Sequence, residues 1–182
     1  MDIIKLVNKA LSDEDIRTIL GSNTKIIKYS ELSKYRDLDD LLPNLLDYVI
    51  ILYEDSPNQG HWIGLLKYNN IFEFFDPYGM IPDKQLTWTS LKTRQSLNED
   101  VPYLSNLLKH ERYIYNRVKY QDEDSYVMTC GAHVCHRIYR LINNNMNLEQ
   151  YHDFMKNLKD ESKINYDLIV ASFIKLKLKD SV

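Results

Sequence analysis

Three residues that could carry acyl-transfer chemistry stand far apart in the sequence: His61, Asp76 and Cys130. Such chemistry needs a thiolate nucleophile, an imidazole that takes and returns a proton, a group that orients the imidazole, and donors for the oxyanion. Cys130 stands where apolar residues begin to recur at helical spacing. A thiol at a helix start lies near the positive end of the helix dipole, which lowers its pKa. We therefore take Cys130 as the candidate nucleophile, with a buried, inert residue at a helix start as the alternative. The adjacent Gly131 would let a substrate backbone come close.

His61 and Asp76 are predicted to lie at the same end of a two-stranded ribbon. HWIGLLKY (61–68) and IFEFF (71–75) are typical of strands, and Asn69-Asn70 between them favours a hairpin turn, because asparagine tolerates positive φ. Asp76 precedes a proline, which favours extended geometry at the strand end. A carboxylate at one strand end can then orient a histidine at the start of the other. The alternative is a structural histidine beside an ordinary turn.

Gln121 is the candidate for the remaining requirement, an oxyanion donor. It closes a predicted strand, RYIYNRVKYQ (112–121), before the polar loop that leads to Cys130. Its side-chain amide could lie beside the backbone N–H of Cys130. A surface glutamine at a strand end is the alternative.

The elements that must position these residues follow from periodicity and caps. We predict helices over 3–11 and 13–20, with Ser12 and Asp15 as a capping box, then a short strand in KIIKY. LDYVIILY (46–53) favours a strand covered on both faces. Residues 80–100 are predicted to form a loop with little regular structure, and 102–111 a helix. Further helices are predicted from Gly131 to the asparagines at 143–145, and over 147–158 and 163–178.

Composition excludes several classes of protein. The 182 residues carry a formal net charge of −3, with no clustered basic face of the kind that binds nucleic acid. Only two cysteines occur, and at a helical spacing of five their side chains point about 140° apart, so we expect no disulfide between them. The acidic N-terminus does not resemble a signal peptide, and no apolar run approaches a membrane span. We expect one domain over 1–182, not secreted and without membrane attachment.

Taken together, His61-Trp62, FFDPYG (74–79), Gln121 and TCG (129–131) resemble the adenain/Ulp1 class of cysteine peptidases. Within that class the sequence is most similar to the adenovirus-type maturation proteases of virophages and polinton-like elements. The order His, Asp, Gln, Cys matches the class and reverses the order of papain. The resemblance covers about residues 28–140.

The resemblance implies an α+β, papain-like/adenain-like fold in which a mixed β-sheet packs against the helix that follows Cys130. It implies Cys130 as nucleophile, His61 as base, Asp76 as the orienting acid, and Gln121 with the Cys130 N–H as the oxyanion hole. Trp62 would help shape a tunnel that favours glycines before the scissile bond. The expected substrates are capsid or other virion precursors, cleaved by a monomer in the host cytoplasm, the viral factory and the virion. No cofactor is expected, and the DNA and peptide activators of the adenovirus enzyme are not carried over to this acidic chain.

Other functions remain open at this stage. A deubiquitinase or SUMO-type isopeptidase would use the same residues but needs a surface that grips a folded modifier. An acetyltransferase would need a basic pocket, and a non-catalytic capsid-assembly module would have an unreactive Cys130. A metal site of Cys130, His133, Cys135 and His136 is disfavoured because these residues fan out around a helix. We expect His133, His136, Arg137 and Arg140 to form the solvated face of that helix.

Overall fold

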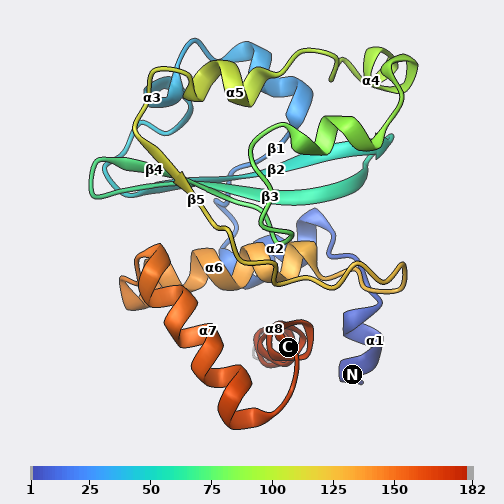
Figure 1. The fold of residues 1–182 in the computed structure, drawn as a ribbon, viewed down its shortest axis with the longest axis vertical. Coiled ribbons are helices and arrows are strands. Elements are labelled where there is room, and N and C mark those ends of the chain that lie inside the picture. The colour runs from blue at the N-terminus through green and yellow to red at the C-terminus, as the bar shows by residue number, and fades with distance from the viewer. Residues whose placement is uncertain (1, 180–182) are drawn as a thin grey trace. The chain divides into compact units, whose positions relative to one another are not determined.

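The computed structural model of the protein describes residues 2–179 (Figure 1). Two compact units are distinguished along the chain. One, here called the sheet unit, spans Lys25–Arg117 and contains every strand. The other, the helical unit, combines the residues up to Thr24 with those from Val118 onward. Each is described by itself.

The sheet unit is built on a mixed five-stranded sheet with the strand order β1-β2-β3-β4-β5. Its strands are β1 (Ile26–Lys28), β2 (Asp47–Ser56), β3 (Gln59–Tyr68), β4 (Ile71–Phe75) and β5 (Tyr113–Tyr115). The central strands β2, β3 and β4 are antiparallel, whereas β1 and β5 pair in parallel at the two edges. The fold is therefore α+β with a mixed sheet, as the sequence predicts.

The predicted turn between β3 and β4 is confirmed. Asn69 and Asn70 both adopt positive φ, at 50° and 57°, and Tyr68 pairs with Ile71 across the turn. Asparagine tolerates this backbone conformation because its short polar side chain hydrogen-bonds locally. The turn fixes the register of the hairpin that carries His61 and leads into Asp76.

One face of the sheet packs on an apolar core. Side chains from alternate positions of β2, β3 and β4 meet those of the helices that lie over this face (Figure 1). The core includes Val49, Ile51, Tyr53, Ile63, Leu65, Phe72, Phe74, Leu86, Leu104 and Leu108. Successive side chains along β3 point to opposite faces of the sheet, so His61 lies on the same face as Ile63, two residues later. His61 therefore faces the segments that cross this side of the sheet.

Short helices cover this side of the sheet, and the apolar periodicity of the sequence does not predict all of them. They are the 3₁₀ helices η1 (Tyr29–Lys34) and η2 (Lys84–Trp88) and the α-helices α3 (Leu38–Leu41), α4 (Leu91–Leu97) and α5 (Tyr103–Leu108). The expectation of a loop with little regular structure over 80–100 is therefore wrong. No residue of α4 is buried, so its sequence carries no apolar stripe from which a helix could be predicted. The predicted strand over 112–121 is also too long, since β5 ends at Tyr115.

The helical unit consists of α1 (Ile3–Val7), α2 (Asp13–Leu20), α6 (Cys130–Asn144), α7 (Leu148–Ser162) and α8 (Tyr166–Lys179). The capping box of α2 is confirmed, with Ser12 and Asp15 bonding each other's backbone N–H. The first helix is shorter than the predicted 3–11. α8 contacts α1, α2, α6 and α7, so it is the centre of this unit. Among residues 2–179, no helix has the length and apolar character needed to span a bilayer.

The expected solvated face of α6 is wrong for three of its four residues. His133, His136 and Arg137 are almost fully buried. Each has at least one polar atom bonded to a residue outside α6: Nε2 of His133 bonds Asp167, Nδ1 of His136 bonds Tyr151, and Arg137 donates to the carbonyl of Met146. Burial of polar groups is tolerated because these hydrogen bonds replace those lost to water.

Candidate active site

His61 lies near the start of β3, directly opposite Tyr53 of β2. The residue before it, Gly60, has a φ of 155°, and a Cβ at this position would lie 1.8 Å from the carbonyl oxygen of Tyr53. Only glycine fits so close to the neighbouring backbone. Gly60 therefore allows β3 to approach β2 closely at the point where His61 begins the buried part of the strand.

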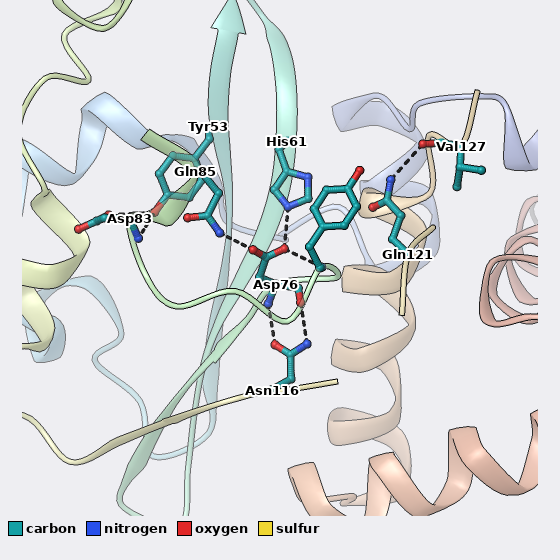
Figure 2. A network of polar contacts seen from close by, with 9 residues as sticks. Tyr53, His61, Asp76, Asp83, Gln85, Asn116, Gln121 and Val127 are labelled. Carbon is teal, nitrogen blue, oxygen red and sulfur yellow. Dashed lines mark hydrogen bonds and ion pairs between the residues drawn. The ribbon is translucent and has the colours of Figure 1, made fainter. Parts of the chain in front are cut away.

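The His61 imidazole is hydrogen-bonded to the Asp76 carboxylate (Figure 2). The distance from Nε2 of His61 to Oδ1 of Asp76 is 2.8 Å, and both side chains are buried. Asp76 follows β4 immediately, as predicted for a residue that ends the strand. The structure thus brings together the two residues that the hairpin argument placed at one end of the ribbon.

The Asp76 carboxylate is held by further donors. Its Oδ1 accepts the backbone N–H of Tyr78 at 2.9 Å, and its Oδ2 accepts the side-chain amide of Gln85. The backbone of Asp76 is bonded in both directions by Asn116, whose Oδ1 accepts the Asp76 N–H at 2.8 Å and whose Nδ2 donates to the Asp76 carbonyl at 2.6 Å (Figure 2). A buried carboxylate with several donors keeps a fixed orientation. The imidazole that it bonds is oriented in turn.

Aromatic rings enclose His61. Tyr78 stacks on the imidazole with centroids 5.0 Å apart, and Trp88 meets it edge-on at 5.1 Å. Trp88 is nevertheless 46% exposed, whereas Trp62, the tryptophan expected to bind substrate, is only 6% exposed. Of the chain's two tryptophans, Trp88 is the exposed one, and its ring lies beside His61. The role of Trp62 in substrate binding stays a prediction.

The segment that carries Gln85 and Trp88 is fastened to the sheet through Asp83. Its carboxylate accepts the hydroxyls of Tyr29 at 2.6 Å and Tyr53 at 2.9 Å. Burial and the Asp83 charge raise the pKa of both phenols, so both hydroxyls donate at neutral pH. Since Tyr53 lies opposite His61 in the sheet, these bonds fix the start of η2 relative to the imidazole (Figure 2).

Cys130 is the first residue of α6, in the helical unit, and its side chain is buried. Thr129 is the N-cap residue, but its side chain makes no capping hydrogen bond to the helix. Gly131 lies in the first turn, also buried. Neither Cys130 nor Cys135 forms a disulfide. Burial strongly raises the pKa of the Cys135 thiol, which disfavours its reactive thiolate form.

Gln121 is also in the helical unit, but it does not end a strand as predicted. Its buried amide donates from Nε2 to the carbonyl of Val127 at 3.0 Å, within the loop that leads to Cys130 (Figure 2). Within the described part of the chain, its Oε1 has no hydrogen-bond partner. One N–H of the Gln121 amide donates to the carbonyl of Val127. The amide has a second N–H, which could donate a hydrogen bond to an oxyanion.

Sequence reasoning missed four residues that contact the His61–Asp76 pair: Tyr78, Gln85, Trp88 and Asn116. Only Tyr78 carried a signal, since it belongs to the quoted FFDPYG motif. Gln85 and Trp88 lie in the segment predicted as loop, and Asn116 lies in a predicted strand. Among residues 2–179, no group of three or more His, Cys, Asp or Glu side chains is arranged to bind an ion.

Comparison with known proteins identifies a relative. No family model matches the chain. The uncharacterized protein V9 of the Sputnik virophage is 33% identical over 166 residues, which cover 89% of this chain and 92% of V9. This chain belongs to the V9 family. The match to V9 covers 89% of the chain and therefore includes parts of both compact units.

Solved structures resemble the V9-family fold more distantly. The SUMO protease Ulp1, with its catalytic cysteine oxidized to a sulfinic acid, is 15% identical, with a TM-score of 0.46, over 99% of this chain and 83% of that one. ChlaDub1 from Chlamydia trachomatis is 13% identical, with a TM-score of 0.42, over 98% of this chain and 76% of that one.

Proposed function

We propose that the chain is a cysteine endopeptidase of papain-like/adenain-like fold that processes capsid or other virion precursor proteins. Its nucleophile would be Cys130, its general base His61 and its orienting acid Asp76. The observation that carries the proposal is the buried hydrogen bond from Nε2 of His61 to Asp76, whose carboxylate is also held by two further donors, the backbone N–H of Tyr78 and the side-chain amide of Gln85. An imidazole fixed by a carboxylate is the arrangement that activates a nucleophile in acyl-transfer enzymes.

The tautomer of His61 follows from this bond. A carboxylate accepts only, so Nε2 carries the proton that is donated to Asp76, and Nδ1 is the basic nitrogen. The proposed reaction requires the Cys130 thiol to come within hydrogen-bond distance of Nδ1. Nδ1 then takes the thiol proton, and the thiolate attacks the scissile carbonyl carbon. The resulting oxyanion would be bound by the amide of Gln121 and the N–H of Cys130.

Breakdown of this tetrahedral intermediate completes the first half of the reaction. The C–N bond breaks, the leaving amine takes the proton from His61, and a thioester remains on Cys130. Water then attacks the thioester while His61 takes one of its protons. The carboxylic acid product leaves and the proton returns to the sulfur, so that atoms and charges balance.

The V9 relative comes from a virophage, and this supports virion proteins as the substrate class that we propose. We propose that cleavage follows Gly-containing sequences, because glycine has no side chain and its backbone can pass close to the rings around His61. We propose that the exposed Trp88, the buried Trp62 and Gly131 contact the substrate. We expect the peptidase to act as a monomer in the host cytoplasm, the viral factory and the virion, without a metal or cofactor.

Alkylation of the native protein tests the proposal. Iodoacetamide would be applied from about pH 5 to about pH 9, spanning the thiol reference pKa of ~8.5, with mass spectrometry separating Cys130 from Cys135. An activated thiolate predicts fast labelling of Cys130 well below that reference value, lost in His61→Ala. Labelling of Cys130 that rises only near the reference value would show an ordinary thiol and a non-catalytic module.

Substrate identity is tested separately. The virion precursors of the same virus would be incubated with wild-type protein and with Cys130→Ala, and the new termini sequenced. Cleavage after glycine in the precursors alone supports maturation. Cleavage only of ubiquitin or SUMO conjugates would replace it with isopeptidase activity.

A further inference from the structure

Asp167 lies in the first turn of α8, far in sequence from every residue of the proposed site. Its side chain is only 3% exposed, which is rare for a carboxylate. It belongs to the same compact unit as Cys130 and Gln121. The proposed chemistry does not use it.

The donors to Asp167 come from the two ends of one loop. Its Oδ2 accepts the backbone N–H of Asp122, the residue after Gln121, at 3.1 Å. Its Oδ1 accepts the hydroxyl of Thr129, the residue before Cys130. One carboxylate therefore holds both ends of the segment 122–129 that separates the proposed oxyanion donor from the proposed nucleophile.

A third donor ties the same carboxylate to α6. Nε2 of His133, one turn after Cys130, lies 3.0 Å from Oδ1 of Asp167. Burial lowers the pKa of His133, and for Asp167 the donors outweigh burial and lower its pKa as well. At neutral pH a neutral imidazole thus donates to a charged carboxylate, which makes the bond charge-assisted and strong.

The bond to Thr129 also affects the start of α6. Threonine at an N-cap usually accepts a hydrogen bond from a backbone N–H of the first turn. Here the Thr129 hydroxyl donates to Asp167, and its side chain caps no N–H of the helix. The first turn, which contains Cys130, is therefore not closed by its own N-cap side chain. Backbone N–H groups at a helix start are the donors that bind a developing negative charge.

We propose that Asp167 is a positioning residue that sets the distance between Gln121 and Cys130 and keeps the start of α6 open to an oxyanion. This inference rests on the proposed function. Loss of Asp167 would free both ends of the segment 122–129 and let Thr129 turn back to cap the helix. The thiol itself would stay as reactive as before, because the side-chain hydrogen bonds of Asp167 go to Asp122, Thr129 and His133 and not to the thiol.

The test compares Asp167→Asn with wild type in hydrolysis of a fluorogenic peptide that ends in Gly-Gly-amidomethylcoumarin. The side-chain N–H₂ of asparagine cannot accept a hydrogen bond, so at least one of the three donors to Asp167 loses its acceptor. Removing one oxyanion donor outright costs about 10²–10³ in kcat, and we expect a loss of at least about tenfold for a displaced one. KM and the rate of Cys130 alkylation by iodoacetamide should each stay within about twofold of the wild-type value. A loss of folding would not lower kcat while leaving these two quantities unchanged.

Two further variants complete the test. Val170→Ala, at a buried position of the same helix, lowers the melting temperature without touching the carboxylate. It should leave kcat unchanged. Thr129→Val removes one of the three donors at nearly constant volume and should lower kcat severalfold, even where Asp167→Asn fails to fold.

Three results would overturn the inference. Unchanged kcat in both Asp167→Asn and Thr129→Val would remove the positioning role while leaving the peptidase intact. A loss of kcat in Val170→Ala equal to that in Asp167→Asn would show that lower stability, and not the lost hydrogen bonds, causes the effect. Wild-type protein that neither hydrolyses the peptide nor shows His61-dependent alkylation would overturn the proposed function itself, and the role of Asp167 with it.

Discussion

The imidazole of His61 and the carboxylate of Asp76 form a buried hydrogen bond of 2.8 Å, although fifteen residues separate them in sequence. The carboxylate is held in turn by Tyr78 and Gln85, and its backbone by Asn116. In the proposed peptidase, the bonds to Tyr78, Gln85 and Asn116 would fix the acid Asp76, and Asp76 would orient the base His61.

Asp76→Asn should lower kcat/KM by up to about 10⁴-fold, because an amide facing His61 favours the wrong tautomer of the imidazole. Some activity above that of Cys130→Ala should remain, since Asp76 orients the base and does not touch the substrate. The measurement is hydrolysis of the Gly-Gly coumarin peptide. Asp39→Asn, at an exposed carboxylate of the sheet unit, is the matched control.

Two outcomes would contradict the role given to Asp76. One is full activity in Asp76→Asn. The other is a folded Asp76→Asn protein with no more activity than Cys130→Ala.

Gly60→Ala should destabilise the protein and remove most activity. The added Cβ would meet the carbonyl oxygen of Tyr53 at 1.8 Å, so β3 must move away from β2 at the residue before His61. Thermal unfolding checks the loss, at about 2–4 °C for each kcal/mol in a domain of this size. Gly21→Ala is the control: its φ is also positive, at 114°, but nothing lies within 4 Å of its Cβ. Equal melting temperatures for the two variants would argue against a steric cause.

Trp88→Ala should raise KM with a smaller change in kcat, because its exposed ring lies beside His61, where the proposed reaction brings the substrate. If the lost aromatic contact contributes about 1.4 kcal/mol to substrate binding, KM rises about tenfold. Trp88→Phe should recover part of the affinity. Leu91→Ala removes an exposed apolar side chain from the neighbouring helix and should leave KM unchanged. A fall in kcat alone would instead assign Trp88 to packing of His61.

Glu99→Gln should stabilise the protein above neutral pH and have little effect near pH 5. The Glu99 carboxylate accepts the backbone N–H of Glu54, and burial together with the Glu54 charge raises the pKa of Glu99 from 4.5 to about 7. The folded state therefore binds a proton that the unfolded state has released, and stability falls as pH rises between these two values. Glutamine keeps the acceptor and removes the charge.

Melting temperatures of wild type and Glu99→Gln at about pH 5.5 and about pH 8 measure this effect, which we expect to be on the order of 4 °C at the higher pH. The same difference at both pH values would show that the charge of Glu99 is not its cause.

Several features were predictable because their causes are local. The Asn69-Asn70 turn follows from the tolerance of asparagine for positive φ, and the capping box at Ser12 follows from two side chains three residues apart. The start of α6 at Cys130 follows from apolar spacing. In each case the residues that form the feature are neighbours in sequence.

The missed features depend on distant partners. Asn116 lies in a segment predicted as strand, but its side chain instead binds the backbone of Asp76, forty residues away. Gln85 and Trp88 sit in η2, which is held by Asp83 and the tyrosines of other elements. No short-range pattern encodes such contacts.

The sequence by itself determined the residue types, the hairpin that carries His61 to the end where Asp76 lies, and the helix that begins at Cys130. Only the tertiary structure decided the hydrogen-bond partners of Asp76 and the burial of His133, which bonds Asp167 from a helix late in the chain. The physical reason is that a buried polar group needs a partner, and the packing of segments far apart in sequence decides which residue provides it.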